Sequence, residues 1–224
     1  MESRYERQRA LLGDAAQDRL KHARIAILGC GGLGGYLLEQ LVRCGVGTVT
    51  VIDGDTFTES NLNRQFLCTP ELLGTPKAAA AKARALQIDP TVQIHAVCDW
   101  LCAKNAAALL HGHDLVLDAL DNVPARLIME DACAELGIPI VHGAVDGWCA
   151  QVGLVPPGSG MLHRLYDSML APPQTAANLA CTCAFCASLQ AAEAIKLLSG
   201  EASANENSLI LFDLNTMESE RIFL

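Results

Sequence analysis

The chain has 224 residues, of which 51% are hydrophobic and only 4% aromatic, a composition that fits one α/β domain spanning 1–224 and leaves no room for a second catalytic domain. Its formal net charge of −9 argues against a broad surface for nucleic acid or for an anionic membrane. The first residues are polar and the first apolar run, 25–28, is too short for a signal sequence or a membrane span, so we expect a cytoplasmic protein.

Apolar runs and turn residues predict strands that alternate with helices, which is typical of a parallel sheet with right-handed crossovers. After a polar helical segment at 4–22, we expect strands at 24–28, 48–52, 92–97, 115–118 and 138–142, and helices at 33–44, 77–87, 103–110 and 124–136. Gly137 is expected to cap the last of these helices. A strand at 148–155 and an antiparallel pair at 208–212 and 218–223 follow.

The predicted fold is therefore a Rossmann-like, doubly wound and mostly parallel sheet, with an N-terminal helical segment and a C-terminal antiparallel extension. Prolines, glycines and serines gather in 155–178, the only loop-rich stretch. Too little chain follows this stretch to build another domain. We expect it to cross or cover the fold as a lid and not to link two domains.

A glycine-rich turn ends the first predicted strand, where Gly29, Gly31, Gly32 and Gly34 stand in the spacing G-x-G-x-x-G with one extra glycine. Such a turn lets a phosphate approach backbone amides at a helix N-terminus, where the helix dipole favours an anion. Asp53 ends the second strand, where a carboxylate either starts a turn or accepts hydrogen bonds from ribose hydroxyls. No GxxxxGK[ST] loop is present, so the kinase type of phosphate cradle is not supported.

A second motif, Ser-Asn-Leu-Asn-Arg-Gln at 60–65, distinguishes ATP chemistry from redox chemistry. Its Arg64, with Lys77 after it, supplies cations that a reacting triphosphate needs and a dehydrogenase does not. Asp121 follows the fourth strand, at the edge where open α/β sheets bind ligands, and is predicted to hold Mg²⁺. Asn122 is expected to cap the next helix.

Together these motifs resemble the ThiF/MoeB/HesA family, the bacterial relatives of ubiquitin-activating enzymes, over most of the chain, from 4–8 to 188–196. The resemblance implies a homodimer that uses ATP and Mg²⁺ to adenylate the C-terminal glycine of a small ubiquitin-like sulfur-carrier protein ending in Gly-Gly. A sulfur-donor protein is a further candidate partner. Membrane and nucleic acid are not expected as partners.

The same resemblance assigns the site residues. Asp53 would bind the ribose, Arg64 and Lys77 the phosphates and Asp121 the magnesium, while Arg7, in the helical segment before the first strand, would reach the nucleotide of the partner subunit. The candidate catalytic residues are Arg7, Arg64, Lys77 and Asp121, and the candidate nucleotide-binding residues are Gly29, Gly31, Gly32, Gly34, Asp53, Asp55, Asn61, Arg64, Gln65 and Lys77.

The ten cysteines are spread through predicted strands and helices, so we expect reduced thiols. Cys181, Cys183 and Cys186 contain one C-x-x-C, which would indicate zinc only with a second pair, and the chain has none. The resemblance implies that many family members hold a structural zinc with two such pairs, but 161–166 stands here in place of the first. These three cysteines are therefore weak zinc candidates that more simply line the start of a helix. The cysteine that some members use for sulfur handling falls near Pro173, so a covalent sulfur-transfer step is not supported.

Two other functions stay open. A related branch of the family uses ATP to dehydrate a modified adenosine in tRNA, but a net charge of −9 argues against the basic surface that RNA requires. A nicotinamide-binding oxidoreductase or a nucleotide-sensing module would leave Arg64, Lys77 and Asp121 without a shared role. The sequence does not name the carrier or its pathway, whether thiamine, molybdopterin or another sulfur metabolite.

Overall fold

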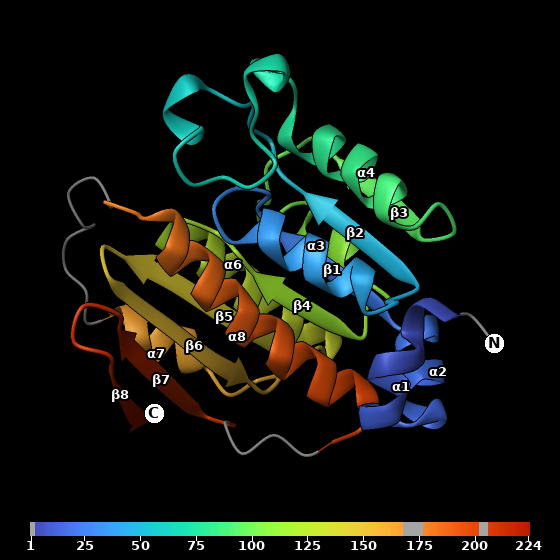
Figure 1. The fold of residues 1–224 in the computed structure, drawn as a ribbon. Helices are drawn as coiled ribbons and strands as arrows, with labels where there is room; N and C mark the ends of the chain where they lie inside the picture. The colour runs from blue at the N-terminus through green and yellow to red at the C-terminus, as the bar shows by residue number, and fades with distance from the viewer. Residues whose placement is uncertain (1–2, 168–176, 202–205) are drawn as a thin grey trace.

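The computed structural model describes residues 3–167, 177–201 and 206–224. In these ranges the strands form one eight-stranded sheet in the order β3-β2-β1-β4-β5-β6-β7-β8 (Figure 1). The parallel strands are β1 (Arg24–Leu28), β2 (Thr48–Ile52), β3 (Gln93–Val97), β4 (Leu115–Asp118) and β5 (Ile140–Asp146). The antiparallel strands are β6 (Cys149–Val155), β7 (Ser208–Asp213) and β8 (Glu218–Phe223). The predicted mostly parallel sheet with an antiparallel extension is confirmed.

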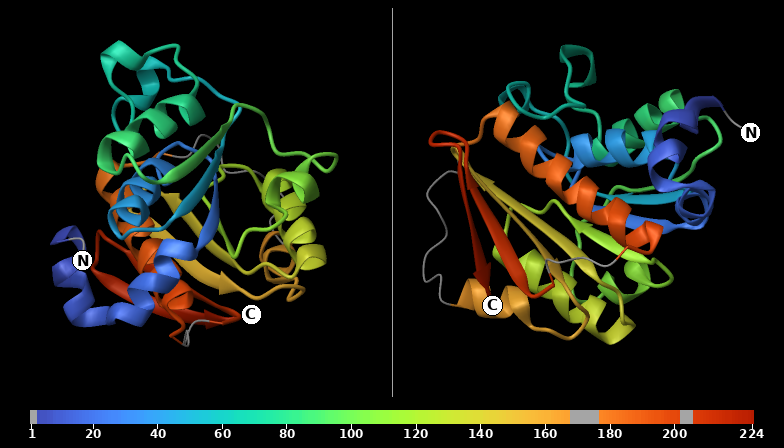
Figure 2. Two further views of the ribbon diagram at one scale, coloured as in Figure 1. Left: turned by 90° about the vertical axis from the view of Figure 1, so that its right-hand side faces the viewer. Right: turned by 60° about the horizontal axis from the view of Figure 1, so that its bottom comes forward.

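Helices cover both faces of the sheet (Figure 2). One apolar core includes residues of α3 (Gly34–Arg43), α4 (Lys77–Ile88) and α8 (Ala180–Ser199), and the other includes α5 (Ala106–Leu110), α6 (Val123–Leu136) and α7 (Met161–Asp167). In β1, Ile25 and Ile27 belong to the first core, and Ala26 and Leu28 to the second. Successive side chains of a strand point to opposite faces, so a sheet covered twice needs an unbroken apolar run.

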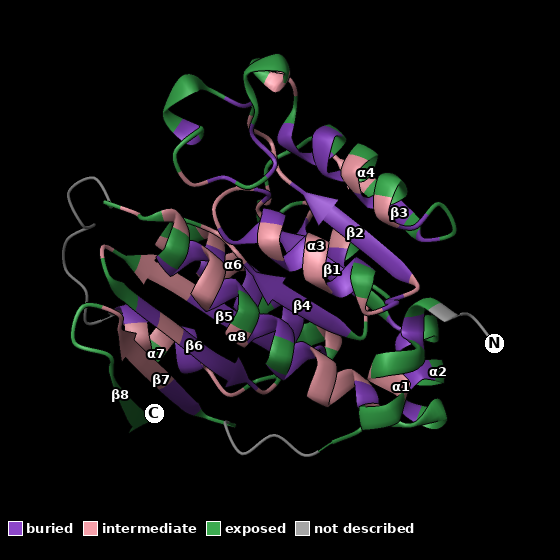
Figure 3. Ribbon diagram, viewed as in Figure 1, coloured by how far each residue is buried: buried purple, intermediate pink, exposed green. Residues whose placement is uncertain are grey.

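α8 is long and apolar enough to cross a membrane by length and composition. It packs instead against α3, β5 and β6, where the sheet changes from parallel to antiparallel strands. Figure 3 shows buried and exposed positions alternating along this helix. We therefore interpret α8 as a core helix of the fold.

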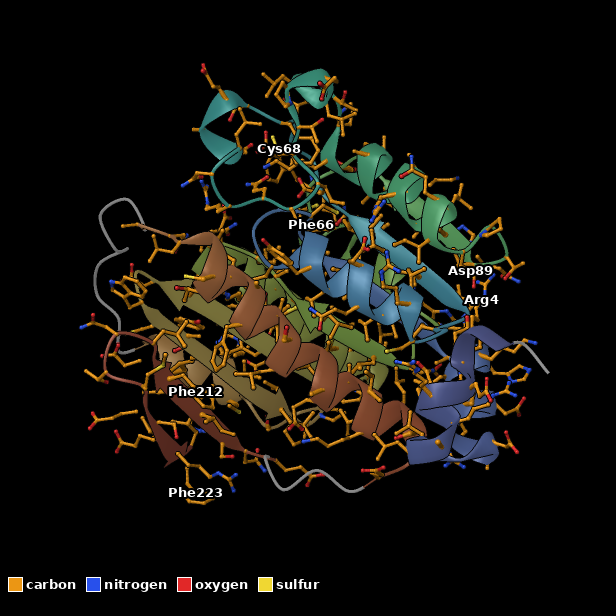
Figure 4. The ribbon with its side chains drawn as sticks, in the orientation of Figure 1. Arg4, Phe66, Cys68, Asp89, Phe212 and Phe223 are labelled. Carbon is orange, nitrogen blue, oxygen red and sulfur yellow. The ribbon has the colours of Figure 1, made fainter. Side chains whose placement is uncertain are left out.

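The N-terminal helical segment is divided into short pieces and anchored to the rest of the fold. These pieces are η1 (Ser3–Tyr5), α1 (Glu6–Leu12) and α2 (Asp14–His22). Arg4 Nη1 lies 2.8 Å from Asp89 Oδ2, and Tyr5 Oη donates to the same oxygen at 3.2 Å (Figure 4). Asp89 stands between α4 and β3, at the amino ends of the strands. The start of this segment is therefore anchored at the amino edge of the sheet.

Two expected elements depart from the observed ones where side chains form hydrogen bonds with the backbone. The stretch expected to be a loop contains α7, because both oxygens of Glu130 on α6 accept the amides of Leu162 and His163, each at 2.9 Å. This contact caps α7 from a distant element. Residues 168–176, with Pro173 and the expected lid, lie outside the described residues.

α5 begins later than the expected helix at 103–110. Asn105 Oδ1 accepts the amide of Cys102 at 2.8 Å, and Asn105 Nδ2 donates to the carbonyl of Trp100 at 2.9 Å. These local bonds hold the residues before α5 in a turn and compete with helix formation. Gly137 ends α6 at φ 70°, in the left-handed conformation predicted for it.

Candidate nucleotide-binding site

The glycine turn joins β1 to α3 with very close backbone contacts. A β-carbon on Gly29, where φ is 95°, would lie 2.5 Å from the carbonyl oxygen of Ala119, and one on Gly34 would lie 1.8 Å from that of Gly29. Only glycine fits at both positions. The first turn of α3 has no side-chain cap, so its amides are suited to an anion such as a phosphate.

Asp53 is oriented by the same turn. Its Oδ2 accepts the amide of Cys30 at 2.7 Å, and its Oδ1 accepts the amide of Asp55 at 2.8 Å. Burial raises the pKa of Asp53 above its usual value, and these two backbone hydrogen bonds oppose the rise. A carboxylate has about four acceptor positions, so about two remain for ribose hydroxyls.

Lys77 is almost buried beside the turn. Its side chain is 8% exposed, and its Nζ lies 2.6 Å from Asp55 Oδ2. A buried ammonium needs such an anionic partner. The hydrogen bond from Lys77 lowers the pKa of Asp55, and the Lys77 charge also acts to lower the pKa of Asp53. Asp55 therefore positions Lys77 and does not need to touch a nucleotide itself.

The segment after β2 carries the second motif and extends past the carboxyl ends of the strands (Figure 1). It contains η2 (Glu59–Asn61) and η3 (Pro70–Leu72). Asn61 is buried, and its Oδ1 accepts the amide of Thr58 at 3.0 Å, which closes a capping box around η2. Arg64 Nη1 donates to the carbonyl of Ser60 at 2.8 Å, and the Arg64 side chain is half-buried. Asn61 thus shapes the loop that presents Arg64.

Gln65 lies on the glycine turn. A β-carbon on Gly31 would lie 3.4 Å from Gln65 Nε2. Gln65 Oε1 is buried and makes no hydrogen bond with the residues that the structure describes. Buried polar atoms are rarely left unpaired, so a group bound at the turn would complete this one. An amide oxygen only accepts hydrogen bonds, so it would pair with a hydroxyl or amino group of a nucleotide and not with its phosphates.

Asp121 stands on the loop between β4 and α6. This loop lies against the end of β1, because the amide of Ala119 donates to the carbonyl of Leu28 at 3.0 Å. Asn122 Oδ1 accepts the amide of Ala125 at 2.9 Å and caps α6, as predicted. Asp121 is exposed at the same edge as the glycine turn.

The described residues are better suited to Mg²⁺ bound together with a nucleotide than to a metal ion bound by protein ligands alone. In the ranges 3–167, 177–201 and 206–224, no three His, Cys, Asp or Glu side chains are placed to hold a metal ion together. Magnesium is commonly bound by one or two carboxylates plus substrate phosphates and waters. The exposed carboxylate of Asp121 is suited to that arrangement.

Arg7 does not reach this site in its own chain. It is exposed on α1, and the neighbouring Gln8 donates from Nε2 to the carbonyl of Cys44 at 2.7 Å, just past the end of α3. α3 runs from the glycine turn back to the amino ends of the strands (Figure 1). Arg7 and the glycine turn therefore lie at opposite ends of the sheet.

Comparison with known proteins agrees with this geometry. A model of the ThiF family matches residues 5–224. The chain belongs to the ThiF family. It is 38% identical over 223 residues to "Sulfur carrier protein adenylyltransferase" of Thermus thermophilus, covering 94% of this chain and 82% of that protein. It is 38% identical over 222 residues to "Sulfur carrier protein ThiS adenylyltransferase" of Bacillus subtilis, covering 96% of this chain and 66% of that protein.

The fold also matches a solved structure with bound nucleotide, described as "Crystal structure of E. coli MccB + ATP", with a TM-score of 0.85 and 22% identity over 100% of this chain and 72% of that one. At this identity the match shows the fold alone. The named relatives of this ThiF-family chain are adenylyltransferases, which supports an ATP-dependent adenylyltransferase.

The cysteine cluster lies at the start of α8, beside the site of this ThiF-family protein. Cys181 is exposed, whereas Cys183 and Cys186 are buried. A β-carbon on Gly32 would lie 2.9 Å from Cys183 Sγ, so this thiol packs on the glycine turn. Burial raises the pKa of Cys183 to about 11 and also raises that of Cys186. Both are neutral thiols at neutral pH, which suits packing better than metal binding or nucleophilic attack.

The sequence did not predict a buried polar cluster beneath the site. It comprises Asp118, Arg126, His142, Gln151 and Tyr166, and we call it the Asp118 cluster. Asp118 Oδ2 lies 2.6 Å from His142 Nδ1 and 3.3 Å from Arg126 Nε. Gln151 Nε2 donates to His142 Nε2 at 2.9 Å, so the neutral histidine carries its proton on Nδ1. Tyr166 Oη lies 3.3 Å from the same His142 Nε2.

The charges of the Asp118 cluster balance one another. Burial acts to raise the pKa of Asp118, but Arg126 and His142 hold it below its usual value. Burial lowers the pKa of His142 despite the carboxylate beside it. The members come from β4, α6, β5, β6 and α7, so no local motif contains them. The available signals were a charged residue that ends the apolar strand β4 and a histidine in the otherwise apolar start of β5.

Proposed function

We propose that this protein adenylates the C-terminal glycine carboxylate of a small ubiquitin-like sulfur-carrier protein, with release of pyrophosphate. The observation that carries the proposal is the meeting, at one edge of the sheet, of the glycine turn, the oriented carboxylate of Asp53, the buried Lys77 and the exposed Asp121. The names of the two relatives above support a sulfur carrier as the second substrate.

The reaction needs positive charge more than it needs a base. A carboxylate oxygen of the carrier attacks the α-phosphorus of ATP, the bond from that phosphorus to the bridging oxygen breaks, and the electron pair leaves with pyrophosphate. The attacking carboxylate is already ionised at neutral pH. Lys77 and Arg64 would offset the repulsion between two anions and stabilise charge on the phosphate oxygens. Magnesium held by Asp121 and the phosphates would neutralise charge on the leaving group.

The proposal includes a homodimer in which each site receives Arg7 from the partner subunit. The position of Arg7 at the amino edge of its own sheet supports this, because its own glycine turn lies at the other edge. The ten cysteines are all free, which supports the reducing cytoplasm as its location. A sulfur donor would act on the carrier adenylate in a later step.

The test is ATP–pyrophosphate exchange with purified protein, Mg²⁺ and candidate carriers encoded in the same genome. We expect exchange that requires both Mg²⁺ and a free C-terminal glycine carboxylate. A carrier lacking its last glycine is the matched negative control. A folded protein that binds ATP but exchanges pyrophosphate with no Gly-Gly carrier would contradict the proposal. Tighter binding of a nicotinamide cofactor than of ATP would instead favour an oxidoreductase.

A further inference from the structure

Trp100 stands beside the Asp53 end of the candidate site. It follows β3, and the ends of β2 and β3 are held together because the amide of Asp53 donates to the carbonyl of Val97 at 3.0 Å. The residue after Asp53 is Gly54, and consecutive α-carbons lie about 3.8 Å apart. A group that touches Gly54 is therefore next to the carboxylate proposed to bind ribose.

The indole of Trp100 lies flat on Gly54. A β-carbon added to Gly54 would lie 2.7 Å from each of Cγ, Cδ2 and Cε2 of Trp100. Equal distances to three atoms of the five-membered ring place that point over the ring face and not at its edge. Any side chain at this position would displace the indole, so only glycine allows this contact.

The rest of the indole faces solvent although its backbone is fixed. Trp100 is 61% exposed. Its amide donates to Asp99 Oδ1 at 2.8 Å and its carbonyl accepts from Asn105 Nδ2 at 2.9 Å. An exposed indole forgoes the free energy of burying a large apolar surface. The backbone of Trp100 is thus fixed, one face of its ring is covered and the rest of the indole is exposed. This arrangement is suited to stacking with an aromatic ligand.

We propose that Trp100 is the stacking platform for the base of the nucleotide whose ribose Asp53 binds, and that it favours purine nucleotides. This inference rests on the proposed function, because it needs a nucleotide at the glycine turn. The phosphates at α3, the ribose at Asp53 and the base at Trp100 then follow one another along the carboxyl ends of β1, β2 and β3. Every base has an aromatic face, but a purine offers the larger area for stacking.

Binding of Mg-ATP without carrier tests this directly by calorimetry. Trp100→Ala is expected to weaken ATP binding by about 5–150-fold, the range for loss of one stacked base, and Trp100→Phe to keep most of the affinity. Affinity for CTP is expected to fall less than affinity for ATP. Inorganic tripolyphosphate, which has no base, should bind Trp100→Ala and the wild type equally. Equal losses for ATP and tripolyphosphate would overturn the proposal, because the change would then act on the phosphate site.

Fluorescence provides an independent measurement, because the chain has two tryptophans. Trp148, 48% exposed between β5 and β6, provides the matched control. In Trp148→Phe protein, Trp100 is the only reporter, and ATP should quench its emission with the calorimetric Kd. In Trp100→Phe protein, Trp148 should respond little, and Trp148→Ala should leave ATP affinity unchanged.

The outcomes separate the two proposals. If the wild type binds ATP, Asp53→Ala loses that binding and Trp100→Ala does not, the nucleotide site stands and the stacking platform is wrong. If the wild type does not bind ATP, the proposed function itself fails. Absence of quenching in Trp148→Phe protein saturated with ATP would also overturn the role of Trp100.

Discussion

The nucleotide edge and the Asp118 cluster adjoin at β4 but are built in opposite ways. At the edge, polar groups are fixed mainly by backbone amides, as Asp53 is by those of Cys30 and Asp55, and some still have unused bonding capacity. In the Asp118 cluster, fully buried Asp118 and His142 are paired with side chains from distant elements. Hydrogen-bonding capacity that the protein leaves unused is available to a ligand, whereas buried side chains that pair with one another stabilise the fold. Changes at the edge should therefore reduce activity, and changes in the cluster should reduce the free energy of unfolding.

The largest effect is expected for Asp118→Asn. The change leaves the buried charge of Arg126 without its anion, and breaking a buried pair in this way costs about 3–5 kcal/mol. Urea unfolding followed by circular dichroism measures the loss. Tyr166→Phe is the control at the margin of the cluster, where one hydrogen bond is worth about 1 kcal/mol. Equal stability of Asp118→Asn and wild type would contradict the inference that the Asp118 cluster stabilises the fold.

The next effect concerns Arg64→Ala and Asp121→Ala at the edge. Each should lower the rate of ATP–pyrophosphate exchange by about 10²–10³-fold, the scale for losing one group that stabilises developing charge. Stability should change by no more than about 0.5 kcal/mol, as for other surface changes. Arg43→Ala, on the far end of α3, is the matched control with full activity expected. A loss of less than about threefold would assign the residue to a structural role.

Subunit mixing sharpens the contrast, because it tests whether one chain alone provides all the residues of the site at the edge. Arg7→Ala and Arg64→Ala should each be inactive alone, whereas heterodimers of the two contain one site with both arginines. Such heterodimers should have about half of the wild-type activity, as closed two-fold symmetry requires. The pair Arg64→Ala and Asp121→Ala, which lie in the same chain's site, should give no rescue. Inactive Arg7/Arg64 heterodimers, once shown to form, would place Arg7 outside the partner's site.

A smaller effect is the pH dependence of the Asp118 cluster. Folding lowers the pKa of His142 below its usual value of 6.5, so below that pH the unfolded chain binds a proton that the folded chain excludes. Stability from this group is complete above pH 6.5 and decreases as the pH falls, by at most about 1.4 kcal/mol per pH unit. His142→Asn should flatten this part of the Tm profile between pH 7.5 and pH 5.5. Parallel profiles for the two proteins would contradict the assignment.

The smallest effect is expected on removal of zinc. Buried, neutral Cys183 and Cys186 predict less than one bound zinc per chain, and EDTA should leave Tm unchanged. Elemental analysis after purification without added metal checks this. Stoichiometric zinc that disappears in a Cys183→Ser, Cys186→Ser double variant would show a metal site.

The same contrast explains what the sequence could predict. Strands, the glycine turn and the caps at Asn122 and Gly137 depend on residues close together in the chain, so pattern and turn chemistry were sufficient. Of the two bonds that orient Asp53, the one from Asp55 is equally local, whereas the one from Cys30 joins the ends of two different strands. The cap that Glu130 places on α7 and the pairing of Asp118 with His142 join residues far apart in the chain. No short-range pattern encodes such contacts, because they depend on the order of strands in the sheet.

The sequence also could not predict which individual site residues are buried. Lys77 opens an alanine-rich helix and could equally have been an exposed lysine, but its ammonium is enclosed and paired with Asp55. Trp100 belongs to no sequence motif, and its proposed role depends on its contact with Gly54, which lies in another loop. Arg7 shows the reverse case, because its proposed role depends on a second copy of the chain.

β8 has a consequence for the solubility of the protein. It is the last strand of the sheet, and every one of its residues is exposed (Figure 3). An open edge of this kind can pair with the edge of another copy, and Phe223, 76% exposed, adds apolar surface to it. Glu218, Glu220 and Arg221 place charge along the same strand, and such charges oppose edge-to-edge assembly. Charge along β8 thus opposes edge-to-edge pairing of this strand with another copy of the chain, so the protein limits fibre-like assembly at the strand that ends its sheet.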